Sequence, residues 1–181
     1  MIITDNIPET IVTERLTVRP VEESDWPVIQ AVWEDVKLTE YNIYDTPKIT
    51  DSTDVRRRVA RWAQATRSGC EHMFFIPCLD GRGIGYFSLN ICPEGYELGY
   101  GFLNAYHGKG YARESLTAIL GYIRGLGAKR ITAGTAINNL PSVALLRSVG
   151  FEQTGTERVS FYKDSSGNDI FFDGGIFEIR L

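Results

Sequence analysis

Hydrophobic and polar positions along the chain recur with two different periods, and the order of these stretches predicts an α/β fold of the α+β type. A period of two indicates strands, whereas apolar residues three or four positions apart indicate helices. The expected strands span residues 13–21, 72–78, 84–91, 96–103, 130–137, 151–162 and 170–180, and the expected helices lie at about 25–35, from about 53, at 112–124 and just before 150. This order predicts a mixed, mostly antiparallel central sheet of six to seven strands flanked by about four helices.

Composition limits this architecture to one domain. The chain has 181 residues, of which 43% are hydrophobic and 12% aromatic, so residues 1–181 are expected to form a single domain around one core. No run approaches the roughly 18 apolar residues of a membrane span, and the N-terminus lacks a basic leader, which predicts a soluble, cytoplasmic protein without membrane contact. Cys70, Cys78 and Cys92 have neither CxxC nor metal spacing, so we expect reduced packing residues and no metal site.

The charge distribution disfavours a nucleic-acid partner. The net charge is −4 and the pI is about 5.3, whereas nucleic-acid-binding domains are usually basic. The helix expected from residue 53 carries a group of arginines that should face solvent. They are Arg56, Arg57, Arg58, Arg61 and Arg67. A docking patch for an acidic partner such as a ribosome is the alternative interpretation of this group.

A loop with two glycines separates the strand expected at 96–103 from the helix expected at 112–124. Glycines let backbone N–H groups approach a ligand closely, and a helix N-terminus presents unpaired amides and a partial positive charge. The run Gly108, Lys109, Gly110, Tyr111 and Ala112 therefore predicts a cradle for a phosphate or pyrophosphate. A plain turn without a ligand is the alternative.

Two common phosphate motifs do not fit the chain. A P-loop ends in Gly-Lys-Ser/Thr, whereas Lys109 is followed by Gly110, so nucleoside triphosphate hydrolysis is not expected. The dinucleotide pattern G-x-G-x-x-G also fails, because Tyr86 stands where a motif begun by Gly81 and Gly83 requires its third glycine.

The glycine loop resembles the coenzyme A loop of the GNAT superfamily of N-acetyltransferases. The family pattern is Gln/Arg-x-x-Gly-x-Gly/Ala, and the chain has His107-Gly108-Lys109-Gly110-Tyr111-Ala112, with His107 at the first position. Three further markers are similar to the branch that includes the ribosomal-protein alanine N-acetyltransferases. They are Thr13-Glu14-Arg15-Leu16 with Arg19, Glu97-Leu98-Gly99-Tyr100, and Asn139-Leu140-Pro141-Ser142 with Gly150-Phe151. The resemblance runs from about Thr13 to Leu181 and implies the GNAT fold.

This resemblance implies acetyl-CoA as the cofactor and transfer of an acetyl group to a primary amine. In the family fold the pantetheine arm lies between the strands expected at 96–103 and 130–137, so backbone amides near Phe102 and Leu103 are the expected oxyanion donors. Residues His107 to Ala112 are expected to bind the cofactor. Glu97 is the expected general base, directly or through a water, with a surface carboxylate as its alternative role and Glu157 as a second candidate.

The general acid implied by the family is absent from its usual place. Many GNAT enzymes have a tyrosine four residues before the Gly of Gly-Phe, and this chain has Leu146 there. Ser142 matches the serine that the ribosomal-protein branch places near the sulfur, and Asn139 matches a neighbouring polar ligand of the cofactor. An ordinary N-terminal helix cap is the alternative role for Ser142.

The acetyl acceptor stays open between several classes. The segment 36–50 and the hairpin around Asp164 lie where acceptors enter related folds, and Tyr41, Tyr44 and Asp45 either contact an amine or pack the loop. The candidates are a protein N-terminal amine, a polyamine or other small amine, and an amino sugar or drug. A non-catalytic acyl-CoA-binding module is the alternative function, favoured by His107 and the missing tyrosine, and a homodimer is compatible with either function.

Overall fold

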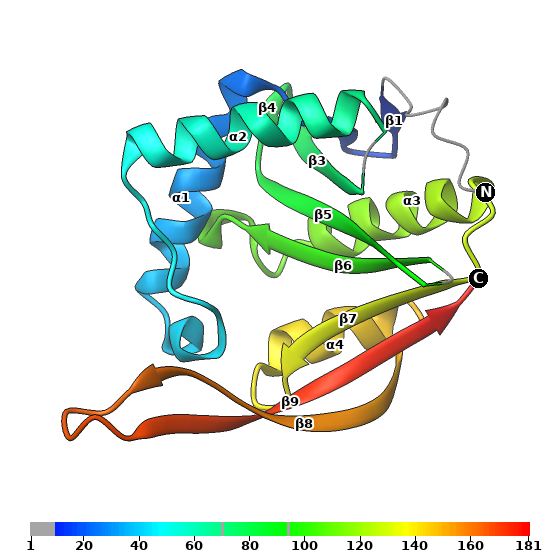
Figure 1. Cartoon of the computed structure of the whole chain (residues 1–181). Helices are drawn as coiled ribbons and strands as arrows, with labels where there is room; N and C mark the ends of the chain where they lie inside the picture. Colours follow the sequence, from blue (N-terminus) through cyan, green and yellow to red (C-terminus); the bar gives the residue numbers. More distant parts are fainter. Residues whose placement is uncertain (1–9, 70, 94) are drawn as a thin grey trace.

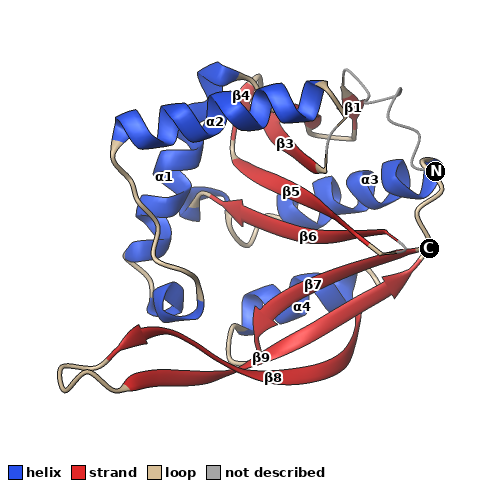
Figure 2. Cartoon of the chain, viewed as in Figure 1, coloured by secondary structure: helices blue, strands red, loops and turns tan. Residues whose placement is uncertain are grey.

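A single large sheet with helices on both faces forms the body of the molecule (Figures 1 and 2). The computed structural model describes residues 10–69, 71–93 and 95–181. The helices are α1 (Trp26–Lys37), α2 (Ser52–Arg67), α3 (Tyr111–Gly125) and α4 (Leu140–Ser148), with short 3-10 turns η1 (Glu23–Asp25), η2 (Glu40–Tyr44) and η3 (Asn104–Tyr106). The strands are β1 (Ile11–Val12), β2 (Thr17–Pro20), β3 (His72–Leu79), β4 (Arg82–Gly83), β5 (Gly85–Cys92), β6 (Gly95–Phe102), β7 (Arg130–Ala136), β8 (Glu152–Lys163) and β9 (Asp169–Arg180).

The described residues form a nine-stranded sheet, which corrects the expected six to seven strands. The strand order is β1-β2-β3-β5-β6-β7-β9-β8, with β4 paired to β3 beside this path. β1 and β4 have two residues each, too few to leave a period in the sequence. The strand expected at 13–21 is interrupted, because the Thr13 amide donates to the Leu16 carbonyl at 2.9 Å and turns the chain before β2.

Each face of the sheet carries its own apolar core. On one face, α3 and α4 pack Leu116, Ile119 and Leu146 against strand residues such as Leu98. On the other face, α1 and α2 cover β3 and β5, with Ile29 and Val59 among the buried residues. Because side chains alternate along a strand, Leu98 points to the first face and its neighbour Glu97 points to the α1–α2 face.

The cysteines that the structure describes are unpaired. Cys78 is buried on β3 and Cys92 is half-buried at the end of β5, and both are free thiols. Cys70 lies outside the described residues. In the part of the chain that the structure describes, no helix is long and apolar enough to cross a membrane.

Candidate active site

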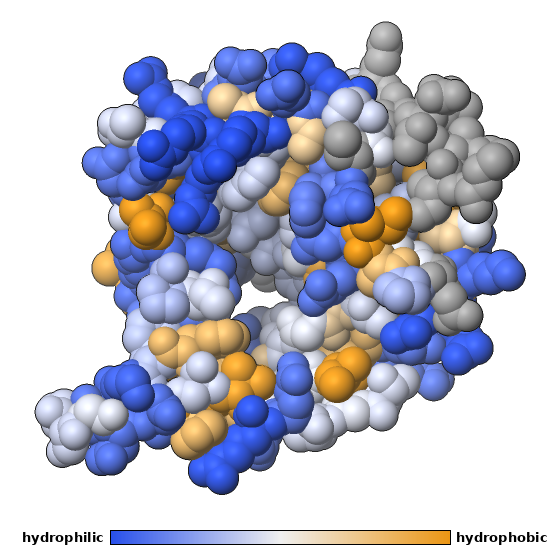
Figure 3. Space-filling model, viewed as in Figure 1, coloured by the Kyte–Doolittle hydropathy of each residue, from blue (hydrophilic) through white to orange (hydrophobic). Residues whose placement is uncertain are grey.

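The sheet opens between β6 and β7. Their parallel pairing runs from Gly95–Arg130 to Leu98–Ala133 and ends there. Beyond that point β6 stays with β5 as far as Phe102, and β7 stays with β9 as far as Ala136. The two strands therefore diverge, and the space-filling view shows an opening through the molecule between them (Figure 3).

The end of β6 presents backbone groups to this opening. The Leu103 amide donates to the Ile84 carbonyl at 3.0 Å, on the β5 side. Because backbone groups alternate between the two edges of a strand, those of Tyr100 and Phe102 point to the β7 side. The Phe102 carbonyl accepts a hydrogen bond from His107 Nε2 at 2.9 Å. The Phe102 amide therefore faces the opening, whereas the Leu103 amide already donates to Ile84, the residue before β5. The oxyanion role of these amides stays a prediction.

The glycine loop ends in an open helix N-terminus. Gly108 and Gly110 have φ values of +70° and +82°, a left-handed region that favours glycine. Gly110 is the N-cap of α3, without a side-chain cap, and the helix begins with a bond from the Glu114 amide to the Gly110 carbonyl at 3.0 Å. The amides of the intervening first turn are therefore open to a ligand. No atom lies within 4 Å of a Cβ built on Gly108, so the protein does not cover the loop at this glycine.

Arg15 fixes a positive charge beside this cradle. Its Nε donates to Glu114 Oε2 at 2.7 Å and its Nη1 to the Lys109 carbonyl at 3.0 Å. The guanidinium carbon also lies 4.6 Å from the centre of the Tyr111 ring. In the sequence Arg15 is only a family marker, because nothing local indicates a partner 99 positions away. The structure gives this marker a physical role, which is to hold the first turn of α3 in place.

Glu114 would repel a pyrophosphate if its charge were not compensated. It sits in the first turn of α3, where Oε1 accepts hydrogen bonds from the Thr13 hydroxyl at 2.6 Å and the Arg15 amide at 2.7 Å. Burial favours the neutral acid, but these hydrogen bonds and the Arg15 guanidinium outweigh it and hold the pKa of Glu114 below its ordinary value. The ionised carboxylate thus anchors Arg15 at the loop.

The His107 and Lys109 side chains of the loop turn back onto the protein. His107 bonds the end of β6, and its own amide donates to the Asn104 carbonyl at 3.1 Å. Lys109 Nζ donates to the Ala105 carbonyl at 2.9 Å and lies 5.7 Å from the centre of the Tyr106 ring. Both residues lie at the cradle, as expected, and in this arrangement they shape the loop.

Tyr100 and Ser142 meet beside the opening. The Tyr100 hydroxyl and Ser142 Oγ share a hydrogen bond of 2.7 Å. The N-cap of α4 is Asn139, whose Oδ1 accepts from the Ser142 amide at 3.3 Å, so the N-cap role belongs to Asn139. Burial raises the pKa of Tyr100 to about 12, against an opposing effect of the Ser142 hydrogen bond. The phenol is therefore protonated at neutral pH.

The sequence alone does not single out Tyr100. The family's usual tyrosine position, Leu146, is fully buried in the core. Leu146 follows Ser142 by four residues and so shares its face of α4. A phenol thus reaches this helix face from β6 instead. In the sequence, Tyr100 stands only as the last residue of the marker Glu97-Leu98-Gly99-Tyr100. The structure places it two residues beyond the last pair with β7.

Glu97 and Glu157 flank the opening on the α1–α2 face. Glu97 is exposed and pairs in register with Asn90 and Thr132, one pair before β6 and β7 separate. Glu157 pairs with Gly174, opposite the open part of β7, and its Cγ is 3.4 Å from a Cβ built on Gly174. Glu97 therefore lies at the closed end of the opening, and Glu157 lies on the far side of β9 from the open part of β7.

The segment and the hairpin expected at the acceptor entrance contact each other. The Tyr44 ring lies 5.2 Å from the Phe172 ring, and the Tyr162 hydroxyl donates to Asn42 Oδ1 at 3.5 Å. Tyr44 thus packs against the hairpin. Asp45 forms an ion pair with Lys48 at 3.0 Å.

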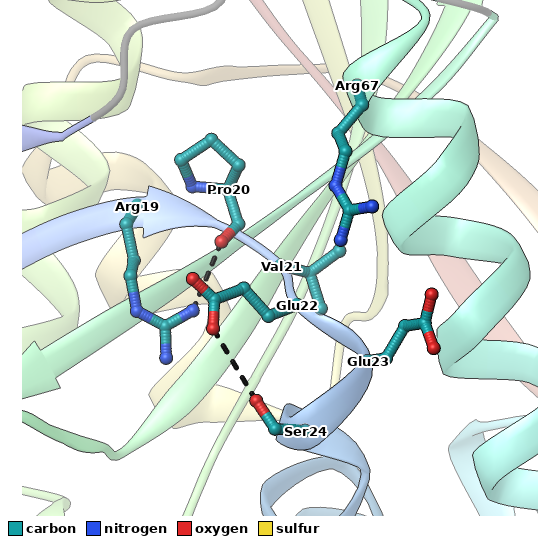
Figure 4. A pocket seen from close by; sticks show the side chains of 7 residues that line it. All are labelled: Arg19, Pro20, Val21, Glu22, Glu23, Ser24 and Arg67. Carbon is teal, nitrogen blue, oxygen red and sulfur yellow. Dashed lines mark hydrogen bonds between the residues drawn. The ribbon is translucent and has the colours of Figure 1, made fainter.

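A cavity of about 540 Å³ lies elsewhere, at the end of β2 beside the C-terminal end of α2 (Figure 4). Arg19 lines it, but its two terminal nitrogens both donate to Asp25 at 2.8 Å. Glu22 and Glu23 add negative charge to the same wall. None of the residues expected at the active site lines this cavity, so we do not assign it to acetyl transfer.

Known proteins place this arrangement in a family. A family model described as an acetyltransferase (GNAT) domain matches residues 15–152. An uncharacterized N-acetyltransferase, p20, of Bacillus licheniformis is 32% identical over 156 residues, which cover 83% of this chain and 86% of the relative.

Two solved structures share the fold. The ribosomal-protein-S5-alanine acetyltransferase of Vibrio fischeri superposes with a TM-score of 0.77 at 17% identity, over 94% of this chain and 96% of that one. A RimL ribosomal L7/L12 α-N-protein acetyltransferase in complex with coenzyme A superposes with a TM-score of 0.79 at 19% sequence identity, over 96% of this chain and 98% of that one. The expected resemblance is confirmed: the chain belongs to the GNAT family of acetyltransferases, enzymes that use acetyl-CoA.

Proposed function

We propose that the chain transfers the acetyl group of acetyl-CoA to a primary amine that approaches from the α1–α2 face of the sheet. The observation that carries this proposal is the Tyr100–Ser142 pair beside the point where β6 and β7 separate. When bound, acetyl-CoA supplies a thioester whose carbonyl carbon accepts the amine and whose sulfur departs. Family membership favours this enzyme over the non-catalytic acyl-CoA-binding module.

In this proposal the residues around the opening act as general base, oxyanion donor and proton donor. Glu97 takes a proton from the incoming amine through a water, and the Phe102 amide stabilises the developing oxyanion. The Ser142 hydroxyl gives its proton to the departing sulfur, the protonated Tyr100 replaces that proton on Ser142 Oγ through their shared hydrogen bond, and solvent returns a proton to the phenol. Positioned acid–base groups typically contribute 10²–10⁴-fold to rate, and one oxyanion donor about 10²–10³-fold.

Glu157 is the second candidate for the base, because it pairs with Gly174 on β9, which in turn pairs with Ala136 at the open end of β7. Replacing each carboxylate separately tests the choice. Glu97→Gln should lower kcat about 100-fold with unchanged coenzyme A affinity, whereas Glu157→Gln should lower kcat less than about threefold. The reverse pattern would move the base to Glu157.

The phenol of Tyr100 can be tested with a matched control. Tyr100→Phe should lower kcat about 10- to 100-fold and leave the Kd for coenzyme A unchanged, because only the hydroxyl that returns a proton to Ser142 is lost. Tyr96→Phe is the control, since Tyr96 is buried on the same face of β6. Wild-type turnover in Tyr100→Phe would exclude the pair from the protonation step.

The pH dependence of kcat gives a second test of the role of Tyr100. The proton that Tyr100 holds is present below its pKa of about 12 and lost above it. Ionisation of Tyr100 should therefore not lower kcat until the pH approaches that value. A fall of kcat in wild type near pH 10 that is absent from Tyr100→Phe would contradict the raised pKa.

The kind of amine is the finer part of the proposal. The named activities of the S5-alanine and L7/L12 acetyltransferases favour a protein N-terminal amine, by analogy of fold. A small amine is the second candidate, because a cavity of about 220 Å³ opens on the same face of the sheet. Free thiol release from acetyl-CoA in the presence of each kind of amine distinguishes them.

A further inference from the structure

The smaller cavity, of about 220 Å³, lies between the helices α1 and α2, the segment 46–49 and the strands β3 and β5. Its inner wall is aromatic. Trp62 and Phe74 are stacked with their centroids 4.1 Å apart, and Trp33 meets the edge of Trp62 at 5.9 Å. The Trp33 indole donates to the Tyr86 hydroxyl at 3.3 Å, so both polar atoms are satisfied within the wall. The stacked faces of Trp62 and Phe74 cover each other, and Lys48 Nζ lies 5.9 Å from the centre of the Trp33 ring. The parts of this fixed aromatic cluster that line the cavity give it an apolar wall for a planar group.

The rim of this cavity has an excess of positive charge. Lys48 and Arg58 both line the cavity. Lys48 is paired with Asp45 at 3.0 Å, so its charge is largely compensated. Arg58 has no ion pair with any residue that the structure describes, whereas its neighbour Arg57 is bonded to Asp54. The uncompensated guanidinium favours an anionic group on the bound molecule.

The cavity also lies next to the opening between β6 and β7. Ser88 and Tyr86, which line it, are in register with Gly99 and Gly101 on β6. A Cβ on Gly99 would stand 2.5 Å from Ser88 Oγ, and a Cβ on Gly101 would stand 2.9 Å from a Tyr86 ring carbon. Glycine at these two positions leaves room for the Ser88 and Tyr86 side chains, which lie over β6, so the wall of the cavity reaches the strand that borders the opening. Adjacent strands are only about 4.8 Å apart, so an amine on a molecule seated in the cavity reaches the opening.

We infer that the acetyl acceptor is a primary amine that carries an aromatic ring and, on the far side of the ring, an anionic group. The ring lies against the aromatic lining formed by Trp33, Trp62 and Phe74, the anion meets Arg58, and the amine extends past Ser88 toward the opening. The inference rests on the proposed acetyl transfer and names the class of its acceptor.

Three amines test this inference on the full-length protein. They are 4-(2-aminoethyl)benzoate, which has ring and anion, phenethylamine, which has the ring only, and putrescine, which has neither. Binding is followed by tryptophan fluorescence in the presence of coenzyme A, since two of the three tryptophans line the cavity. Transfer is followed by thiol release from acetyl-CoA. We expect the benzoate to have a Kd about tenfold lower and a kcat/KM about tenfold higher than phenethylamine, and putrescine to be poorest.

The role of Arg58 is tested by two matched variants on α2. In Arg58→Gln, the Kd and kcat/KM of the benzoate should become equal to those of phenethylamine. The values for phenethylamine itself should stay within about twofold of wild type. Arg61→Gln removes an exposed arginine that does not line the cavity and should keep the tenfold preference. The inference would be overturned if wild type had equal Kd and kcat/KM values for the two ring amines. It would also be overturned if Arg58→Gln lowered affinity and kcat/KM equally for both.

The two readouts separate this inference from the proposed function. An Arg58-dependent binding preference without thiol release from any amine would support the pocket and refute the transfer reaction. Thiol release at equal rates from all three amines would support the transfer reaction and overturn the pocket. If the protein showed no selective binding and released no thiol, both the inference and the proposed function would be refuted.

Discussion

Three helices of this protein begin in two different ways. The N-termini of α2 and α4 are closed by side chains: Asp51 accepts from the Thr53 and Asp54 amides at 3.0 and 3.1 Å, and Asn139 accepts from the Ser142 amide at 3.3 Å. The N-terminus of α3 has a left-handed glycine at the N-cap and no side-chain cap.

The glycine N-cap leaves the first amides of α3 open, which supports the proposed cofactor site there. The helix α1 also lacks a side-chain cap, but it continues directly from the 3-10 turn η1. A capping side chain contributes about 1 kcal/mol by satisfying a helix amide. At α3 that stabilisation is absent. The open amides form the positive end of the helix dipole, and Arg15 lies beside them. The α3 terminus is held by a contact from outside the helix, the Arg15–Glu114 ion pair at 2.7 Å, which leaves the amides free for the cofactor.

Closing the α3 terminus should have the largest effect. Gly110→Asp places a carboxylate at the N-cap, where it competes for the amides and repels the pyrophosphate, so we expect the Kd for coenzyme A to rise about 100-fold by calorimetry. Gly127→Asp is the control for backbone strain, since Gly127 has a similar φ of +80° at the other end of α3. Equal coenzyme A affinity in the two variants would remove the basis for the cradle.

Removing the external contact should have a smaller effect. Arg15→Gln leaves Glu114 uncompensated near the pyrophosphate and should weaken coenzyme A binding about tenfold. Arg15→Gln combined with Glu114→Gln should recover part of this loss, because the repelling charge is then also absent. A double variant that binds as weakly as Arg15→Gln would show that Arg15 acts on the ligand alone.

The same ion pair has a signature in the pH dependence of stability. The folded-state pKa of Glu114 is lowered, so its contribution is present above the ordinary pKa of a glutamate and is lost as the pH falls through the lower folded value. Urea unfolding at acidic pH should therefore show a shallower loss of stability in Glu114→Gln than in wild type. An identical acid limb in both proteins would contradict the lowered pKa.

Opening a capped terminus should have the smallest effect. Asn139→Ala should lower the free energy of unfolding by about 1 kcal/mol, or roughly 2–4 °C in Tm for a chain of this size. Asp51→Ala at α2 should do the same without any effect on activity. A loss of coenzyme A affinity confined to Asn139→Ala would show that Asn139 also contacts the cofactor, as the family resemblance implies.

The features that the sequence predicts well are local. The expected helix at 112–124 is observed as Tyr111–Gly125, because its apolar spacing and its flanking glycines lie within one segment. The final hairpin, expected at 151–162 and 170–180, is observed at Glu152–Lys163 and Asp169–Arg180 for the same reason. The uncapped N-terminus of α3 was predictable because glycines and a helix start are adjacent in the chain. Its role as a phosphate cradle stays a prediction.

The features that escaped prediction depend on contacts between distant residues. Tyr100 meets Ser142 across 42 positions, and no periodicity shows which hydroxyl a strand residue will reach. Arg15 and Glu114 likewise come together only after β2 has joined the sheet. The strand expected at 13–21 was too long, because the turn at Thr13 is stabilised in part by the same Glu114.

The central claim is that coenzyme A binds at the N-terminus of α3. The amide NMR spectrum, recorded with and without coenzyme A, tests it most directly, because the N-termini of α2, α3 and α4 are observed at once. The account predicts large shifts for the amides of Lys109 to Arg113 and for Phe102, and little change at Thr53 and Asp54 of α2. Shifts that spare the first turn of α3, or that centre on α2, would contradict it.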